Sequence, residues 1–342
     1  MRSLWGKAPF MLEMRELKTP VPGPGEVLVQ VKACGICGTD LHFLRHNAEW
    51  TPLGHEAVGL VAEVGLDVDG WRGGESVIVE NNTGCGMCPE CKNGRALYCT
   101  NIYSYMNDRA GFADYLLVRS DMIQPYDAER LTPRQATLAE PLTVALDLLQ
   151  RVDPDINDEV AVFGHGPIGL LAVRLAKLRG ARRVFLTGSS RASEHSRYRM
   201  KIGAAMGADV MLSEPEDDIA SAIKALVPNG VDRVLITAPP KTLPLAIDIA
   251  RFGGMIGLIG IEFGKGGEVS LDVNAFHFKK LQLRASHAIP NHYFPMATDL
   301  LARRAVDPEL LLSHAFSLDD YKEAFTALND RGQATAKIVL VP

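Results

Sequence analysis

Residues 158–178, DEVAVFGHGPIGLLAVRLAKL, carry the pattern that decides the fold of this 342-residue chain. The apolar run 158–163 predicts a buried strand, and it leads directly into Gly164-His165-Gly166-Pro167-Ile168-Gly169 and a helical segment. Glycines between a strand and a helix permit a tight turn, close approach of the backbone to a pyrophosphate, and close helix packing. The loop is therefore a candidate dinucleotide-binding site.

Further apolar strands are expected downstream of this loop, at 183–187, 232–237 and 255–261. Helical stretches separate them, and this alternation predicts a doubly wound parallel sheet with helices on both faces. We assign residues 144–283 to this domain.

Upstream, residues 33–56 read ACGICGTDLHFLRHNAEWTPLGHE and concentrate thiol, imidazole and carboxylate groups. Cys37 and His55 are of types that zinc accepts, and Glu56 or a more distant carboxylate would complete a tetrahedron with one position open for water or substrate. The alternative is that Cys34 and Cys37 are small buried apolar residues and that His55 caps a loop. The stretch favours a catalytic metal site.

A second cluster contains four of the six cysteines, spaced C-x2-C-x2-C-x7-C. Four thiolates close the shell of one zinc ion and leave no open position, so such a site is structural. A disulfide pair and an iron–sulfur cluster are the alternatives. The cysteines are Cys85, Cys88, Cys91 and Cys99.

Composition excludes several classes of protein. The chain is 47% hydrophobic and 23% charged, as expected for a globular protein of two domains. No apolar run reaches the length of a membrane span, and the first residues lack a signal-peptide core, so we expect a cytoplasmic protein with no membrane partner. The formal charge of −5 argues against a nucleic-acid partner.

These motifs together resemble the zinc-dependent medium-chain dehydrogenase/reductase (alcohol dehydrogenase) family, and the resemblance covers nearly the whole chain. The strongest signals are CGICGTDLH at 34–42 and GHE at 54–56, which are similar to the polyol (sorbitol-like) and threonine dehydrogenase branches. The resemblance implies a mixed α/β protein. A GroES-like β-barrel catalytic domain is expected at 1–143, with a structural-zinc lobe at 81–101, an inserted Rossmann domain at 144–283, and a return to the catalytic domain at 284–342.

The resemblance also implies roles for single residues. Cys37 and His55 would bind the catalytic zinc, with Glu56 as an intermittent ligand. Glu140, in Glu140-Pro141-Leu142, matches the distant ligand of the polyol and threonine branches, and Pro141 predicts a kink in a helix over 134–149. The remaining matches are Thr39 and His42 for proton relay, Asp40 for orienting a zinc-binding imidazole, and Gly260 and Ile261 beside the nicotinamide ring.

The second strand of the sheet ends in Thr187-Gly188-Ser189-Ser190-Arg191. An NAD enzyme places an acidic residue there to bind the ribose 2′-hydroxyl, and Gly188 occupies that position. Two hydroxyls and a guanidinium offer hydrogen bonds to a 2′-phosphate. The stretch therefore favours NADP(H), while Glu194 leaves NAD(H) possible.

From these features we expect hydride transfer between a nicotinamide cofactor and a polyol or sugar-derived secondary alcohol. An aldose 1-dehydrogenase and a threonine-like amino-alcohol dehydrogenase are the alternatives within the enzyme class. A cofactor-binding sensor without turnover is the alternative outside it. The family resemblance further implies a homo-oligomer, a dimer or a tetramer.

Overall fold

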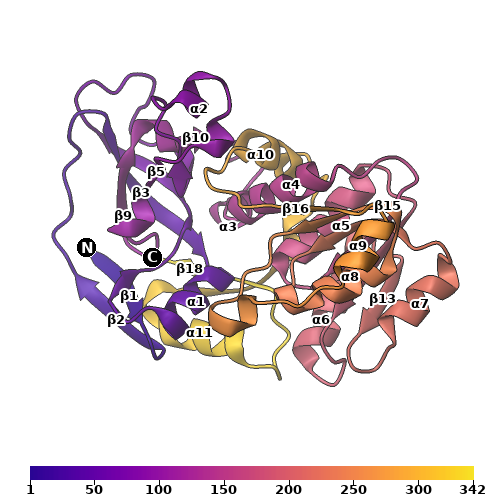
Figure 1. Cartoon of the computed structure of the whole chain (residues 1–342). Helices are drawn as coiled ribbons and strands as arrows, with labels where there is room; N and C mark the ends of the chain where they lie inside the picture. The colour runs from indigo at the N-terminus through magenta and orange to yellow at the C-terminus, as the bar shows by residue number, and fades with distance from the viewer. The chain divides into compact units, whose positions relative to one another are not determined.

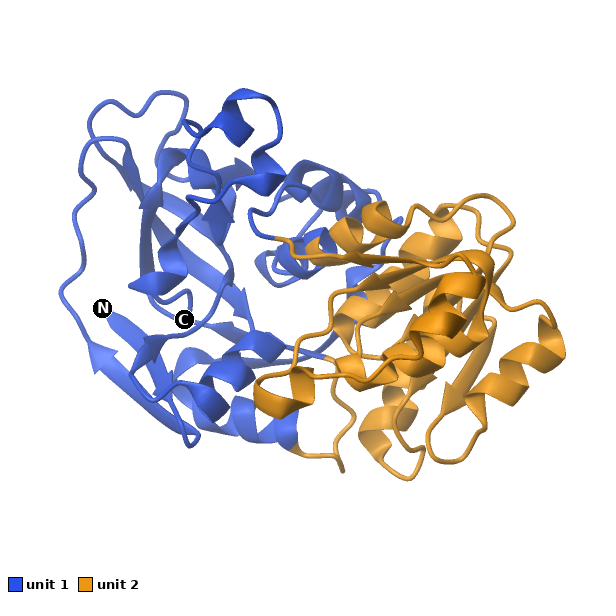
Figure 2. Ribbon diagram, in the orientation of Figure 1, with its two compact units in different colours: residues 1–143, 289–329, 337–342 blue, residues 144–288, 330–336 orange.

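The computed structural model describes all 342 residues, which form two compact units (Figure 2). Unit 1 contains Met1–Thr143, Ile289–Asn329 and Lys337–Pro342, and unit 2 contains Val144–Ala288 and Asp330–Ala336. The chain thus re-enters unit 1 at Ile289 rather than at residue 284. The short stretch Asp330–Ala336 belongs to unit 2, which no sequence pattern indicated.

Unit 2 is built on a six-stranded sheet in the order β13-β12-β11-β14-β15-β16, and every pair in it is parallel. The doubly wound sheet predicted from the sequence is therefore confirmed (Figure 1). β13 and β16 are additional to the strands expected. The strands are β11 (Glu159–Phe163), β12 (Arg183–Gly188), β13 (Val210–Ser213), β14 (Val231–Ile236), β15 (Ala250–Leu258) and β16 (Gln282–Ala285), and the helices are α5 (Pro167–Leu178), α6 (Glu194–Met206), α7 (Ile219–Leu226), α8 (Leu243–Ile249) and α9 (Val273–Phe278).

The central strands of unit 2 are apolar without alternation because helices cover both faces of the sheet. All five residues of β11 are buried, and Phe163, Phe185 and Ile236 lie in one continuous core. Burial of each such side chain contributes about 1.5–3 kcal/mol. This packing fixes the carboxyl ends of β11 and β12, where the glycine loop and Gly188 lie.

Unit 1 is mainly antiparallel. Its largest sheet has seven strands in the order β10-β6-β5-β3-β18-β17, with β9 paired to β3. The strands are β1 (Arg2–Lys7), β2 (Met11–Glu16), β3 (Glu26–Gly35), β4 (Thr51–Pro52), β5 (Glu56–Val64), β6 (Ser76–Val79), β7 (Asn82–Thr83), β8 (Tyr103–Ser104), β9 (Tyr115–Arg119), β10 (Ile123–Pro125), β17 (Leu312–Ser317) and β18 (Lys337–Val341), and the helices are α1 (Gly38–His46), α2 (Pro89–Lys92), α3 (Pro133–Ala136), α10 (Phe294–Ala302) and α11 (Tyr321–Asn329).

The helix expected over 134–149 is in fact two helices, α3 and α4 (Ala139–Val152). The predicted kink at Glu140 is therefore wrong. The break lies before Glu140, and Pro141 falls in the first turn of α4, where a missing N–H breaks no intrahelical hydrogen bond. Glu140 thus sits at the start of a new helix.

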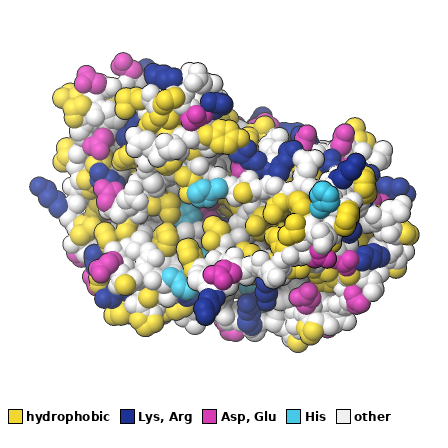
Figure 3. All heavy atoms as spheres, viewed as in Figure 1, with side chains coloured by type: hydrophobic (Ala, Val, Ile, Leu, Met, Phe, Trp, Pro, Cys, Tyr) yellow, Lys and Arg dark blue, Asp and Glu magenta, His cyan; other side chains and the backbone are white.

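Acidic and basic side chains are interspersed on the face shown in Figure 3, in keeping with the modest formal charge of −5. No helix combines the length and the apolar character that crossing a membrane requires.

Candidate active site

The first candidate metal ligand lies at the start of α1. Cys37 is the N-cap residue, in extended conformation with φ −101° and ψ 160°. The fully buried Asp40 accepts hydrogen bonds from Cys37 N at 2.9 Å and from Gly54 N at 2.9 Å. Because one carboxylate binds both segments, it fixes Cys37 relative to the residue that follows Gly54, His55.

His55 is buried, and its Nδ1 lies 3.7 Å from Asp40 Oδ1. Burial disfavours the imidazolium, but the charges of Cys37 and Asp40 outweigh burial and raise the pKa of His55 well above its usual value. A carboxylate facing one ring nitrogen orients the imidazole and directs the other nitrogen elsewhere. This geometry is the one expected if Asp40 orients a ligand.

Glu56 is 1% exposed and receives a hydrogen bond from Lys337 Nζ, a side chain that is itself buried. Lys337 also donates to Ile36 O at 3.0 Å. Burial alone would lower the pKa of Lys337, but the charges of Glu56 and Cys37 raise it above its usual value. A Cβ at Gly35 would lie 1.9 Å from Glu56 Oε2, so only glycine leaves room for this carboxylate.

The donor atoms of Cys37, His55 and Glu56 all lie within 4.8 Å of one another. Glu56 Oε2 is buried and has no hydrogen-bond partner, which is costly unless a cation is bound nearby. Sulfur, imidazole nitrogen and carboxylate oxygen form a donor set that suits zinc. The three residues therefore fit a metal ion.

Glu140 is buried but does not join this group of three. Its Oε1 accepts from Asn81 Nδ2 at 2.9 Å, and burial raises the pKa of Glu140 to about 7 while the charge of His55 opposes that rise. Asn82 Nδ2 donates to Asn81 Oδ1 at 2.9 Å, and Asn291 N donates to Asn82 Oδ1 at 2.9 Å. This asparagine chain is a part of the site that the sequence did not reveal, because asparagines carry no distinctive spacing.

Thr39 and His42 lie three residues apart on α1 and therefore on the same face of the helix. Cys37 Sγ lies 3.7 Å from Thr39 Oγ1, which places the hydroxyl beside the candidate ligand. His42 stacks on His46, with ring centroids 6.1 Å apart. The two predicted relay residues thus follow Cys37 along one helix.

The four cysteines of the second cluster form a separate lobe in which all sulfur atoms lie within 4.8 Å of one another. Cys99 Sγ lies 3.6 Å from Cys85 Sγ and 3.8 Å from Cys88 Sγ, and all cysteines are free of disulfides. A zinc–sulfur bond of about 2.3 Å in a tetrahedron separates the sulfurs by about 3.8 Å. Backbone N–H groups of Met87 and Cys88 donate to Cys85 Sγ and lower the pKa of this thiol to about 6. The lobe fits a structural zinc ion.

In unit 2, the glycine loop follows β11 as predicted. Gly164 has φ +106°, and a Cβ at Gly169 would lie 1.8 Å from Gly164 O, so the backbone packs on itself there. Gly166 is the N-cap of α5, and Pro167 occupies the first turn, where its missing N–H costs nothing. The free N–H groups of this turn suit a phosphate.

Neighbouring side chains fill the space in which a side chain at Gly188 would lie. A Cβ there would lie 2.5 Å from His165 Cδ2 and 2.6 Å from Met200 Cε. His165 Nε2 lies 3.0 Å from Ser196 Oγ, which holds the ring in place. A side chain at the end of β12 would therefore require His165 and Met200 to move, a constraint that the sequence alone did not show.

The candidate phosphate ligands after β12 already have partners. Ser190 Oγ donates to Glu216, and the guanidinium of Arg191 forms an ion pair with Asp217. The nearby Arg197 pairs with Glu194 at 2.7 Å. The hydroxyl of Ser189 lies 3.5 Å from His165 Nε2.

Arg199 differs from Arg191 and Arg197 because its hydrogen bonds go to backbone carbonyl groups and not to a carboxylate. Its Nε donates to Thr335 O at 2.9 Å and its Nη2 donates to Ala336 O at 3.3 Å. Burial and the charge of Arg331 lower the pKa of Arg199 to about 10, so it stays protonated at neutral pH. Its Nη1 lies 4.0 Å from the point where a Cβ would stand if Gly166 carried a side chain. Arg199 therefore adds positive charge beside the glycine loop.

The loops that follow β14 and β15 approach closely at Gly260, where a Cβ would lie 1.8 Å from Ala238 O. Thr237 Oγ1 donates to Phe163 O at 2.9 Å and ties the same loop to β11. Ile261 is 57% exposed. Gly260 is thus required by packing within unit 2, and Ile261 presents an apolar surface.

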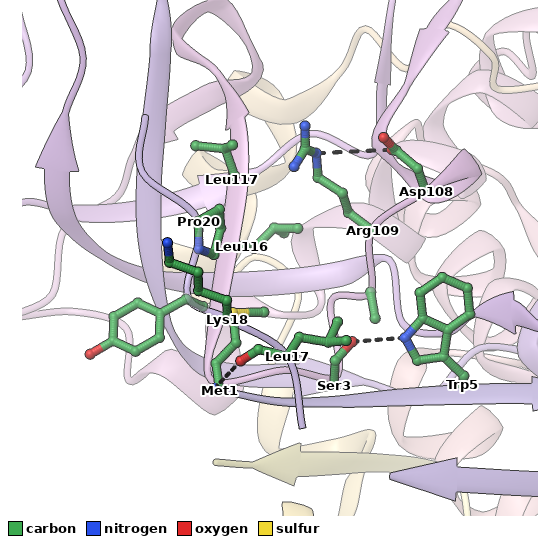
Figure 4. Close-up of a pocket in the computed structure, with 12 residues that line it drawn as sticks. Met1, Ser3, Trp5, Leu17, Lys18, Pro20, Asp108, Arg109, Leu116 and Leu117 are labelled. Carbon is green, nitrogen blue, oxygen red and sulfur yellow. Dashed lines mark hydrogen bonds and ion pairs between the residues drawn. The ribbon is translucent and has the colours of Figure 1, made fainter. Parts of the chain in front are cut away.

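A hollow of about 160 Å³ in unit 1 is lined by none of the candidate site residues (Figure 4). Two hydrogen bonds join its own lining residues: Trp5 Nε1 donates to Ser3 Oγ at 3.1 Å, and Met1 N donates to Leu17 O at 2.6 Å. We assign no chemistry to it.

Comparison with known sequences agrees with this architecture. The sequence model described as the alcohol dehydrogenase GroES-like domain matches residues 23–128, and the one described as zinc-binding dehydrogenase matches residues 167–303. The GroES-like and Rossmann fold class predicted from the sequence is thereby confirmed.

Among curated relatives, L-threonine 3-dehydrogenase of Pyrococcus furiosus is 33% identical over 351 residues, covering 98% of this chain and 96% of the relative. Sorbitol dehydrogenase of Bacillus subtilis is 29% identical over 352 residues, covering 98% and 97%.

Two solved structures also match. An alcohol dehydrogenase from Escherichia coli complexed with NADH has a TM-score of 0.90 at 27% identity, covering 100% of this chain and 99% of the other. A putative zinc-binding dehydrogenase from Sinorhizobium meliloti bound to NADP has a TM-score of 0.88 at 29% identity, with the same coverage.

Fold, donor sets and similarities together define a zinc-dependent, NAD(P)-dependent dehydrogenase that acts on CH–OH donors. The chain belongs to the zinc-containing medium-chain alcohol dehydrogenase family.

Proposed function

We propose that the protein oxidises a polyol or sugar-derived secondary alcohol and transfers the hydride to a nicotinamide cofactor, with NADP(H) preferred. The observation that carries the proposal is the cluster of the half-buried Cys37 with the buried His55 and Glu56, whose donor atoms lie within 4.8 Å of one another. Zinc held there supplies a Lewis acid that lowers the pKa of an alcohol hydroxyl.

In this proposal Cys37 and His55 hold the metal and Glu140 completes the protein ligand set. Asp40 keeps the His55 ring oriented, and Asn81 does the same for the Glu140 carboxylate. Lys337 restrains Glu56, the intermittent ligand.

Proton release is assigned to α1. Thr39 accepts the proton of the substrate hydroxyl while releasing its own, which passes by way of the cofactor ribose to His42, on the same face of the helix. The four cysteines Cys85, Cys88, Cys91 and Cys99 hold a structural zinc ion and take no part in the reaction.

The cofactor is assigned to the glycine loop of unit 2. The N–H groups at the start of α5 and the charge of Arg199 support binding of the pyrophosphate. The preference for NADP(H) is supported by Gly188, which offers no carboxylate, and by the hydroxyls and guanidinium of Ser189, Ser190 and Arg191. Relatives of known structure bind NADH in one case and NADP in another.

A threonine-like amino alcohol is the second candidate substrate. It is favoured by the 33% identity to an L-threonine 3-dehydrogenase over 98% of this chain.

The deciding experiment is cofactor reduction by the zinc-loaded protein. NADP and NAD would each be tested against polyols, aldoses, inositols and amino alcohols. Turnover of polyols with NADP supports the proposal, whereas turnover of L-threonine alone replaces the substrate class. Turnover with NAD alone removes the NADP preference, and absence of turnover with every compound favours a cofactor-binding sensor.

We also propose that copies of the chain associate through the sheet of unit 2. β16 is an edge strand of that sheet, and all four of its residues are exposed. An exposed edge strand presents unpaired backbone groups that a second strand satisfies. Light scattering on the purified protein should give the mass of a dimer or tetramer, and a monomer at micromolar concentration would reject the proposal.

A further inference from the structure

The donors expected to meet a 2′-phosphate are bound by carboxylates from the turn that follows the neighbouring strand, β13. Ser190 donates to Glu216, and Arg191 pairs with Asp217. β12 and β13 are paired in parallel, with Gly188 in register with Ser213. Glu216 and Asp217 lie in the turn that follows β13, at the same carboxyl end of the sheet as Gly188.

Both carboxylates are ionised at neutral pH. The hydrogen bond from Ser190 lowers the pKa of Glu216, and the bonds from Ser213 N and Arg191 lower the pKa of Asp217. The carboxylates of Glu216 and Asp217 thus already contact the hydroxyl and guanidinium groups that a 2′-phosphate would need. A 2′-phosphate has to displace them or remain beside them, whereas a 2′-hydroxyl carries no charge to be repelled.

The end of β12 itself is crowded, whereas the acidic groups come from the turn that follows β13. His165 and Met200 fill the space that a side chain at Gly188 would need. The usual position for a selective carboxylate is thus held by glycine, and the carboxylates that contact Ser190 and Arg191 are Glu216 and Asp217.

We propose that Glu216 and Asp217 are specificity-determining residues for the cofactor. They hold Ser190 and Arg191 in contacts that the 2′-phosphate of NADPH must break and that NADH leaves intact. Glu216 and Asp217 thereby limit the preference for NADP(H) that these two donors would otherwise give, and so set the ratio of the two affinities. This inference rests on the nicotinamide site proposed above at the glycine loop.

The test compares the zinc-loaded full-length protein with the double variant Glu216→Gln/Asp217→Asn. Dissociation constants for NADPH and NADH are measured by cofactor fluorescence, without turnover. Removal of two partly solvated charges should tighten NADPH binding about tenfold and change NADH binding less than about twofold. The gain should shrink at high salt. An unchanged ratio of the two constants overturns the inference.

Two further variants keep the result interpretable. Glu216→Gln alone alters an exposed side chain and leaves the bond from Ser213 N to Asp217 in place, so it retains the fold and should give about a threefold shift. Glu214→Gln removes the same charge from the same segment, but its side chain bonds neither Ser190 nor Arg191. An equal shift in Glu214→Gln overturns the specific role. If the unaltered protein binds neither cofactor, the proposed function fails and this inference fails with it.

Discussion

The metal site of unit 1 and the glycine loop of unit 2 are built in opposite ways. The metal site is made of side chains, and buried charges such as Glu56 and Lys337 hold one another in place. The glycine loop is made of backbone that packs on backbone, as at Gly169 and Gly164 O. Removing a side chain should therefore damage chemistry in unit 1, whereas adding one should damage structure in unit 2.

The largest effect is expected for Cys37→Ser. A serine hydroxyl is a much poorer zinc ligand than a thiolate, so kcat should fall on the order of 10⁴-fold, about 5 kcal/mol of barrier, while the fold is kept. Steady-state kinetics with the preferred alcohol measure this loss. The matched control is Cys34→Ser, a buried thiol whose pKa is raised by burial and which lies outside the donor cluster. Equal losses in both variants would contradict the assignment.

The next effect concerns the contribution of the buried ion pair between Lys337 and Glu56 to the free energy of unfolding. Lys337→Met leaves Glu56 buried without its cation and should lower the free energy of unfolding by about 3–5 kcal/mol. Glu56→Gln in the same chain should restore most of that loss, because it removes the unpaired charge. Urea unfolding of the single and double variants gives both values. A double variant as unstable as the single one would show that the ion pair is not the cause.

Two glycine variants test whether backbone packing holds the glycine loop of unit 2. In Gly169→Ala the new Cβ lies 1.8 Å from Gly164 O, so the backbone must shift, at a cost of about 3 kcal/mol, and cofactor binding is lost. In Gly166→Ala the nearest atom is 4.0 Å away and φ is −69°, so the fold should be unchanged. Thermal unfolding together with NADH titration distinguishes the two. Equal instability would argue against backbone packing as the specific requirement.

The smallest effect concerns pH. Burial and the charges of Arg199 and Arg331 lower the pKa of His165 from 6.5 to about 4. Between pH 6.5 and about 4 the imidazole is protonated in the unfolded chain but not in the folded one. The free energy of unfolding is therefore highest above pH 6.5 and falls by at most about 3 kcal/mol as the pH drops toward 4. Urea unfolding between these pH values should show a shallower loss in His165→Gln than in the unaltered protein. Parallel pH profiles would contradict the account.

Local motifs were the predictable part of this molecule. The cysteine lobe and the glycine loop are each formed by one short stretch, so spacing alone identified their residues and the doubly wound fold around the loop. Cys37, His55 and Glu56 come from two stretches, and the structure brings them together as expected.

Long-range pairs were not predictable from one sequence. Lys337 lies 281 residues from Glu56, and Asn81 lies 59 residues from Glu140. Such pairs follow from the sheet topology, since β18 and β5 both flank β3. The crowding around Gly188 has the same origin, because it depends on where His165 and Met200 pack.

The most direct test of the central claim is the zinc content of the purified chain. We predict two zinc ions per chain in the unaltered protein, one at Cys37 and His55 and one in the cysteine lobe. In Cys37→Ser we predict one, retained by the lobe, with turnover lost. Two zinc ions and full turnover in Cys37→Ser would contradict the assignment of the catalytic metal to this site.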